Sequence, residues 1–154
     1  MRILAQEEYG LRCILQLARH RGPAPLTIAA IAEAEGLSRE YAGKLMQVLR
    51  RAGLVNSSRG PGGGYRLARP PSEISVWEVI DVLGGGLFPG DFCSCHPGQI
   101  KHCVHSTDCS IRALWSMIAG VVRDVLEDVA LADLDRDEAS MAHWLDTVPA
   151  AEGI

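Results

Sequence analysis

The sequence lacks the features that would place it in a membrane or send it out of the cell. No stretch approaches the ~18 consecutive apolar residues that indicate a membrane-spanning helix. The start, MRILAQEEYG, has no basic region followed by a sustained apolar core. We therefore expect a cytoplasmic protein with no membrane partner. A chain of 154 residues suffices for one compact domain that carries an oligomerisation element.

The sequence also lacks the motifs of common enzymes. It contains no evident phosphate-binding loop and no Ser/His/Asp arrangement. Cys93-Ser-Cys95 could form a dithiol redox pair, but no thioredoxin-like βαβ pattern accompanies it. We therefore expect that the protein is not an enzyme.

The two halves of the chain carry opposite charge. Residues 1–70 contain eleven Lys and Arg against five Asp and Glu, whereas residues 71–154 contain four against fourteen, which gives net charges of +6 and −10. This polarity is expected when the first half faces nucleic-acid phosphates and the second half does not. Charge alone does not establish such binding, because basic faces are often merely solvated.

The first half of the chain predicts a winged helix-turn-helix domain. Apolar residues recur at helical spacing in residues 6–20, and Thr27 and Ser38 are suited to cap two further helices that are joined by a tight turn at Gly36. LVNSSRGPGGGYRLARP (54–70) then predicts two short strands around a glycine-rich tip, and a fourth helix follows.

The second half predicts a cysteine-rich loop and a long dimerisation helix. Ile111, Ile118, Val125 and Ala132 lie seven residues apart, and a helix with such a seam most simply pairs with a copy of itself. The alternative is that the seam packs against its own domain. The expected fold class is thus mainly α with a small β-wing. Its parts are the winged helix-turn-helix domain (1–83), the cysteine-rich loop (84–109), the dimerisation helix (110–132), and a short C-terminal helix and tail (133–154).

Basic and polar residues of the third helix and the wing are the candidates for DNA binding. Arg39, Tyr41 and Lys44 lie toward the N-terminal end of the helix, where side chains can reach base edges. Arg50 lies nearer the phosphates, and Ser38 is expected to cap the helix and to touch a phosphate. Arg59, at the wing tip, is suited to the negative potential of a minor groove. The alternative for each cation is a solvated surface position.

The cysteines gather in CSCHPGQIKHCVHSTDC, residues 93–109, which holds four of the five in the chain. Clustered thiols in a reducing compartment are more often metal ligands or redox groups than structural disulfides. Cys95, Cys103 and Cys109 are spaced C-x7-C-x5-C, and Cys93 is an additional thiol. Thiolates suit both iron-sulfur clusters and zinc, so ligand chemistry leaves the metal open. Cys13 lies on an apolar helix face and is expected to be a small buried hydrophobe.

Two segments of the chain resemble the Rrf2-type transcription regulators, the group that contains IscR, NsrR and RirA. MRILAQEEYGLRCILQLA (1–18) is similar to their opening, and LVNSSRGPGGGYRLARPPSEISVWEVI (54–80) is similar to their wing and following helix. The resemblance spans about residues 1–147 and is most specific at RGPGGGY. It implies a homodimeric regulator, for example a repressor, that binds a pseudo-palindromic operator in double-stranded DNA. It also implies that the protein senses redox state, nitric oxide or iron status through an iron-sulfur cluster.

The resemblance also bears on the ligands of that cluster. The C-x7-C-x5-C spacing resembles RirA and favours 4Fe-4S slightly over 2Fe-2S. Three cysteines leave a fourth ligand to find. NsrR uses an acidic residue of the partner subunit, whose matching position here is Glu8, whereas the IscR histidine position is Arg112, which cannot bind a metal. The resemblance therefore favours Glu8, then Cys93, then His105 or His96. The alternative function is a zinc-stabilised DNA-binding regulator without redox sensing.

Overall fold

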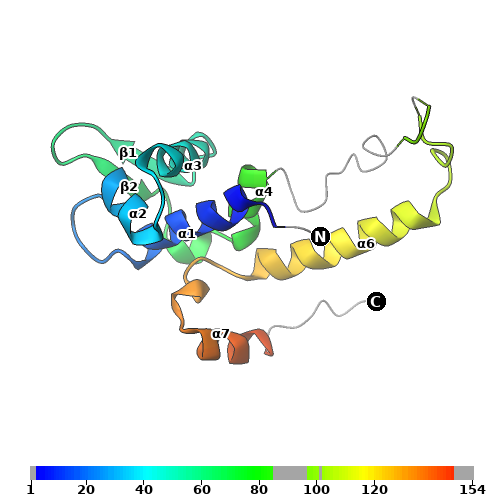
Figure 1. Ribbon diagram of the computed structural model, residues 1–154. Coiled ribbons are helices and arrows are strands. Elements are labelled where there is room, and N and C mark those ends of the chain that lie inside the picture. Colours follow the sequence, from blue (N-terminus) through cyan, green and yellow to red (C-terminus); the bar gives the residue numbers. More distant parts are fainter. Residues whose placement is uncertain (1–2, 85–96, 101, 148–154) are drawn as a thin grey trace.

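The computed structural model of the chain describes residues 3–84, 97–100 and 102–147 (Figure 1). The elements within these residues are mainly helical, with one antiparallel pair of strands. In chain order they are α1 (Ala5–Arg19), α2 (Ile28–Glu35), α3 (Arg39–Arg51), β1 (Val55–Ser58), β2 (Gly64–Leu67), η1 (Pro71–Glu73), α4 (Val76–Gly84), α6 (Ser110–Asp128), η2 (Asp133–Asp135) and α7 (Glu138–Leu145). The expected fold class is confirmed.

The first three helices form the helix-turn-helix around a shared apolar core. The Oγ1 of Thr27 accepts a hydrogen bond from the Ala30 N–H at 3.2 Å, and the Oγ of Ser38 accepts one from the Tyr41 N–H at 3.1 Å, so both expected caps are present. Gly36 ends α2 with a φ of 65°, a left-handed conformation that favours glycine. The capped ends fix the turn that places α3 across α2. The core itself is made of side chains that recur at helical spacing, among them Ile14, Leu17, Ile31, Leu45, Met46 and Leu49.

The wing consists of β1 and β2, which pair from Val55↔Leu67 to Ser58↔Gly64. Leu26 adds a backbone bridge to this sheet, because its N–H donates to the Tyr65 carbonyl at 3.1 Å and its carbonyl accepts from the Tyr65 N–H at 2.8 Å. The segment before α2 is thereby fixed to the wing, a connection that the sequence pattern did not predict.

Helix α6 ends earlier than the sequence seam predicted. The expected helix ran to Ala132, but the helix stops at Asp128 and the chain continues in extended form. There the Val76 N–H donates to the Val129 carbonyl at 2.8 Å, and the Leu131 N–H donates to the Ile74 carbonyl at 2.9 Å. Leu131 is fully buried in the main core. The helix is interrupted because these backbone pairs and this burial replace its last turn.

The C-terminal segment packs against the winged domain, which comprises α1 to α4. The Asp135 carboxylate forms ion pairs with Arg19 at 3.4 Å and with Arg21 at 2.6 Å. A second apolar cluster of Val76, Ile80 and Val129 packs against side chains that include Leu126 of α6 and Trp144 of α7. Within the described residues, no helix is long and apolar enough to cross a membrane. Figure 1 shows that α6 extends away from the winged domain toward the described residues 102–109.

Candidate nucleic-acid interface and cysteine loop

Helix α3 has one face in the core and one face in solvent. Ala42, Leu45, Met46 and Leu49 are buried. The exposed face carries the expected DNA-binding residues Arg39, Lys44 and Arg50, together with Glu40, Gln47 and Arg51. Such a two-sided helix keeps its cations on the solvent side, where a ligand can reach them.

Two of the expected base-reading residues of α3 have partners within the chain. Lys44 Nζ forms an ion pair with Glu40 Oε1 at 2.8 Å, which raises the pKa of Lys44 and lowers the pKa of Glu40. Tyr41 is half-buried, and its ring meets that of Tyr9 edge-to-face with centroids 6.1 Å apart. Glu40 was missed in the sequence analysis, although its spacing four residues before Lys44 is typical of a helical ion pair. A carboxylate on this surface could accept a hydrogen bond from a cytosine amino group.

A groove of about 250 Å³ separates α3 from the wing and brings Arg50 and Arg59 together. Ser57 and Gly43 also line it, and neither was identified from the sequence as part of a site. No acidic residue is among those lining residues, which are Gly43, Gln47, Arg50, Ser57, Arg59 and Tyr65. The two arginines and the hydroxyl therefore make a cationic groove, which suits the phosphodiester backbone.

The glycine-rich tip explains how Arg59 is presented. Gly60 adopts a φ of 101°, and the Gly63 N–H donates to the Gly60 carbonyl at 2.9 Å. A side chain at Gly63 would overlap the Ser58 carbonyl, so the tip can close this tightly only with glycine. The turn leaves Arg59 exposed at the end of a thin projection, as a minor-groove contact requires.

The structure describes part of the expected metal-binding loop. Cys103 and Cys109 are half-buried, and Cys109 is the N-cap of α6, where its Sγ accepts a hydrogen bond from the Arg112 N–H at 3.4 Å. A cavity of about 220 Å³ beside Cys109 is also lined by His105 and Asp108. Asp108 was not among the ligands expected from the sequence. Cys93, Cys95 and His96 lie outside the described residues, among which no three potential metal ligands come together.

The two neighbouring glutamates of α1 point to different environments. Glu7 is 2% exposed, and its Oε2 accepts a hydrogen bond from the Leu4 N–H at 2.6 Å. Glu8, the expected fourth ligand, is exposed. Figure 1 shows the start of α1 well apart from the start of α6.

Cys13 is fully buried in the core, which confirms the expectation that it packs as a small hydrophobe. Burial raises the pKa of its thiol to about 11. The thiol is therefore neutral and inert at physiological pH, and it differs from the partly accessible Cys103 and Cys109.

The N-terminal half of α6 carries an apolar surface that nothing in the single chain covers among the described residues. Ile111 is 60% exposed, Leu114 48% and Met117 45%. The C-terminal half behaves differently, because Leu126 packs against the cluster formed with α4. The alternative foreseen from the sequence, packing on the same domain, thus holds for one end of the helix.

Comparisons with known proteins agree on one family. Residues 3–137 match the Rrf2 family model, which is described as an iron-dependent transcriptional regulator. The HTH-type transcriptional regulator IscR of Vibrio atlanticus is 35% identical over 137 residues, which are 89% of this chain and 76% of that protein. The HTH-type transcriptional regulator CymR of Bacillus subtilis is 34% identical over 134 residues, which are 87% of this chain and 89% of that protein.

Solved structures of similar proteins agree with this family. The structure of T. potens IscR superposes with a TM-score of 0.69 at 35% identity and covers 90% of each chain. The structure of CymR, the global cysteine regulator of B. subtilis, superposes with a TM-score of 0.70 at 33% identity and covers 89% of this chain and 99% of that one.

Proposed function

Because the chain belongs to the Rrf2 family of winged helix-turn-helix transcription regulators, we propose that it binds a pseudo-palindromic operator as a homodimer and senses redox state, nitric oxide or iron status through an iron-sulfur cluster. The observation that carries this proposal is the position of Cys103 and Cys109. They lie at the free end of α6, next to its exposed apolar surface, while the other end of α6 is joined to the winged domain.

DNA binding follows from the exposed face of α3 and from the cationic groove. We assign α3 to the major groove, with Ser38 against a phosphate and Arg39, Tyr41 and Lys44 toward base edges. The groove between α3 and the wing then follows the phosphodiester backbone, so that Arg50 neutralises a phosphate and Arg59 enters the adjacent minor groove. The exposed positions of these arginines support the assignment.

The exposed apolar surface of α6 supports dimerisation. Ile111, Leu114 and Met117 expose large side chains on a helix that projects from its domain, and water contact with such a surface is unfavourable. A second copy of α6 would cover this surface along the seam predicted from the sequence. Two winged domains would then face a two-fold symmetric operator.

The residues of the loop suit the cluster that the family implies. Cys95, Cys103 and Cys109 would hold it, and Cys109 stands at the N-cap of α6, where the loop meets the helix. Glu8 of the partner subunit would be the fourth ligand, with Cys93 or His105 as the next candidates. The separation of the starts of α1 and α6 within one chain supports a ligand from the partner. A bound cluster supplies iron that reacts with oxidants or nitric oxide.

The backbone connections of α6 explain how the loop would influence DNA binding. The loop joins the end of α4 to the start of α6, and the segment after α6 is hydrogen-bonded to Ile74 and Val76 at the start of α4. A change in how the cysteines are held would therefore alter the angle between α6 and the winged domain. The spacing of the two α3 helices in the dimer depends on that angle, so the operator-binding arrangement would gain or lose population.

The decisive experiment combines metal analysis with operator titration. We expect brown protein, purified without oxygen, with matched iron and acid-labile sulfide, and with an operator affinity that changes when the cluster is removed. Cys103→Ala should lose the cluster and this dependence but remain a folded dimer, whereas Cys13→Ala is the matched control and should keep both. Equal affinity of the apo and loaded forms would overturn the sensing model. Colourless protein with stoichiometric zinc would favour the zinc-stabilised alternative.

A further inference from the structure

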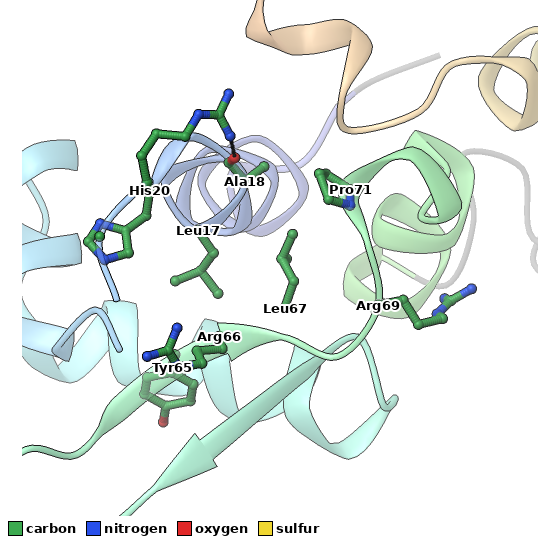
Figure 2. Close-up of a pocket in the computed structure, with 10 residues that line it drawn as sticks. Leu17, Ala18, His20, Tyr65, Arg66, Leu67, Arg69 and Pro71 are labelled. Atoms are coloured by element: carbon green, nitrogen blue, oxygen red, sulfur yellow. Dashed lines mark hydrogen bonds between the residues drawn. The ribbon is translucent and has the colours of Figure 1, made fainter. Parts of the chain in front are cut away.

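Another cavity, of about 270 Å³, lies between the C-terminal end of α1 and strand β2, and Tyr65 lines both this cavity and the cationic groove (Figure 2). We call it the β2 cavity. Its apolar wall includes Leu17 and Ala18 of α1, Leu67 of β2 and Pro71. Figure 2 shows the side chains of Leu17 and Leu67 facing one another across it. Ligand cavities usually begin at about 300 Å³, so this one suits a small molecule.

The rim of the β2 cavity is cationic. His20, Arg21, Arg66 and Arg69 contribute to its lining, and no aspartate or glutamate does. An apolar wall beside several cations is the composition that receives a small organic anion, because the body of the ligand is desolvated while its charge is matched.

The three arginines of the rim differ in how far acidic partners already neutralise their charge. Arg21 is paired with Asp135 at 2.6 Å, and Arg69 is paired with Glu78 at 2.8 Å, both from outside the cavity lining. Within the described residues, neither Arg66 nor His20 forms an ion pair. The Arg66 Nη2 donates to the Pro23 carbonyl, and the His20 Nε2 lies 2.8 Å from the Ala24 carbonyl. Arg66 therefore keeps an uncompensated charge with free donor positions.

We propose that the β2 cavity binds a small monocarboxylate with an apolar body, with the carboxylate on Arg66 and the apolar body between Leu17 and Leu67. A carboxylate matches the planar donors of a guanidinium better than it matches any other side chain. The ligand would leave the ion pairs of Arg21 and Arg69 intact, since it uses the cation that has no acidic partner.

The position of the β2 cavity gives such a ligand a mechanical consequence. Arg66 belongs to the wing strand β2, and its bond to the Pro23 carbonyl connects the wing to the loop before α2. A carboxylate bound to the free donors of Arg66 would shift the guanidinium that makes this connection, and so alter the support of the wing that carries Arg59. The effect on operator affinity rests on the proposed function, whereas ligand binding itself does not.

The experiment titrates the full-length protein with benzoate in the absence of DNA and follows binding by calorimetry and by ligand-detected NMR. We expect saturable binding, about tenfold weaker in Arg66→Gln, because a charge-assisted hydrogen bond contributes enough to account for that factor. Arg66→Lys should recover part of the affinity. Arg123→Gln, which alters an exposed arginine of α6, is the matched control and should bind benzoate as the unmodified chain does.

The outcomes separate the proposal from its competitors. Benzoate binding that does not saturate, or that Arg66→Gln leaves unchanged, would overturn it. Saturable binding of inorganic phosphate without benzoate binding would overturn the requirement for an apolar body. If Arg66→Gln reduces operator affinity and its salt dependence while the unmodified protein does not bind benzoate, Arg66 is a DNA phosphate contact and the proposal is wrong. If the unmodified protein binds benzoate but does not bind operator DNA, the proposed function is wrong and this inference stands.

Discussion

The carboxylate of Glu7 occupies the space where a side chain at Gly84 would lie. Glu7 is buried at the start of α1, and Gly84 is the last residue of α4. The contact therefore joins the start of α1 to the end of α4, from which the cysteine loop continues. The side-chain amide of Gln6 donates to the Leu83 carbonyl and reinforces the same junction. The junction therefore fixes where the loop leaves the winged domain.

We predict that Gly84→Ala destabilises the protein by about 1–3 kcal/mol, because the added methyl group overlaps the Glu7 carboxylate. Gly43→Ala is the control. The new Cβ there would meet Ile28 at 3.9 Å, an ordinary contact, so helix propensity should stabilise the protein by about 0.5–1 kcal/mol. Chemical denaturation measures both. Combining Gly84→Ala with Glu7→Ala should reduce the cost of the former, and strictly additive effects would contradict the overlap.

The Ser38 cap allows helix stability to be separated from DNA binding. Ser38→Ala should cost about 1 kcal/mol, because the Tyr41 N–H loses its acceptor. Ser38→Asn and Ser38→Asp should both retain the cap, but only the aspartate places a negative charge at the proposed phosphate contact. We therefore expect similar thermal stability for these two variants and weaker operator binding for Ser38→Asp. Equal affinities would show that the start of α3 does not approach DNA.

Local chemistry made much of the winged domain predictable. The caps at Thr27 and Ser38 depend on side chains within three residues of the groups that they bind, and the wing follows from a glycine-rich stretch between two short strands. The end of α6 was not predictable in this way. Its extended continuation at Val129 and Leu131 depends on backbone partners at Ile74 and Val76, more than fifty residues earlier in the chain.

The candidate site was predictable as a set of residues but not as an arrangement. No periodicity in the sequence indicates that Arg50 of α3 and Arg59 of the wing line one groove, because their proximity depends on how the sheet packs beside the helix. The burial of Glu7 could have been found. Glu7, Gly10, Ile14 and Leu17 share one helical face, which is buried throughout, whereas Glu8 lies off that face and is exposed.

Arg50 and Arg59 should affect DNA binding in different ways. Arg50→Ala should weaken binding to all sequences similarly and lower the salt dependence by about one phosphate contact. Arg59→Ala should weaken binding most at operators whose flanking minor groove is narrow and A·T-rich, because that groove attracts a guanidinium. Fluorescence anisotropy with matched A·T-rich and G·C-rich flanks distinguishes the two. An Arg59→Ala effect that is independent of the flanks would place the wing outside the minor groove.

The exposed apolar surface of α6 predicts a dimer that one charge can break. Leu114→Glu places a carboxylate in the seam and should convert the dimer to a monomer with much weaker operator binding, because an unpaired charge is costly to bury. Ser116→Glu is the matched control, since this exposed residue lies on the opposite face of α6. Analytical ultracentrifugation should find a dimer for Ser116→Glu. A dimer that persists in Leu114→Glu would exclude this surface as the interface.

The buried thiol of Cys13 predicts how stability changes at high pH. Burial raises the pKa of this thiol from 9.0 to about 11, so above pH 9 the unfolded chain loses a proton that the folded chain retains. The titration of this thiol therefore lowers the free energy of unfolding as pH rises from 9 toward 11. Cys13→Ala should be less stable at neutral pH because it leaves a small cavity, but its decline above pH 9 should be shallower, since no thiol remains to titrate in the core. Urea denaturation of both proteins across this range measures the slopes, and parallel declines would show that Cys13 ionises as readily in the folded chain as in the unfolded one.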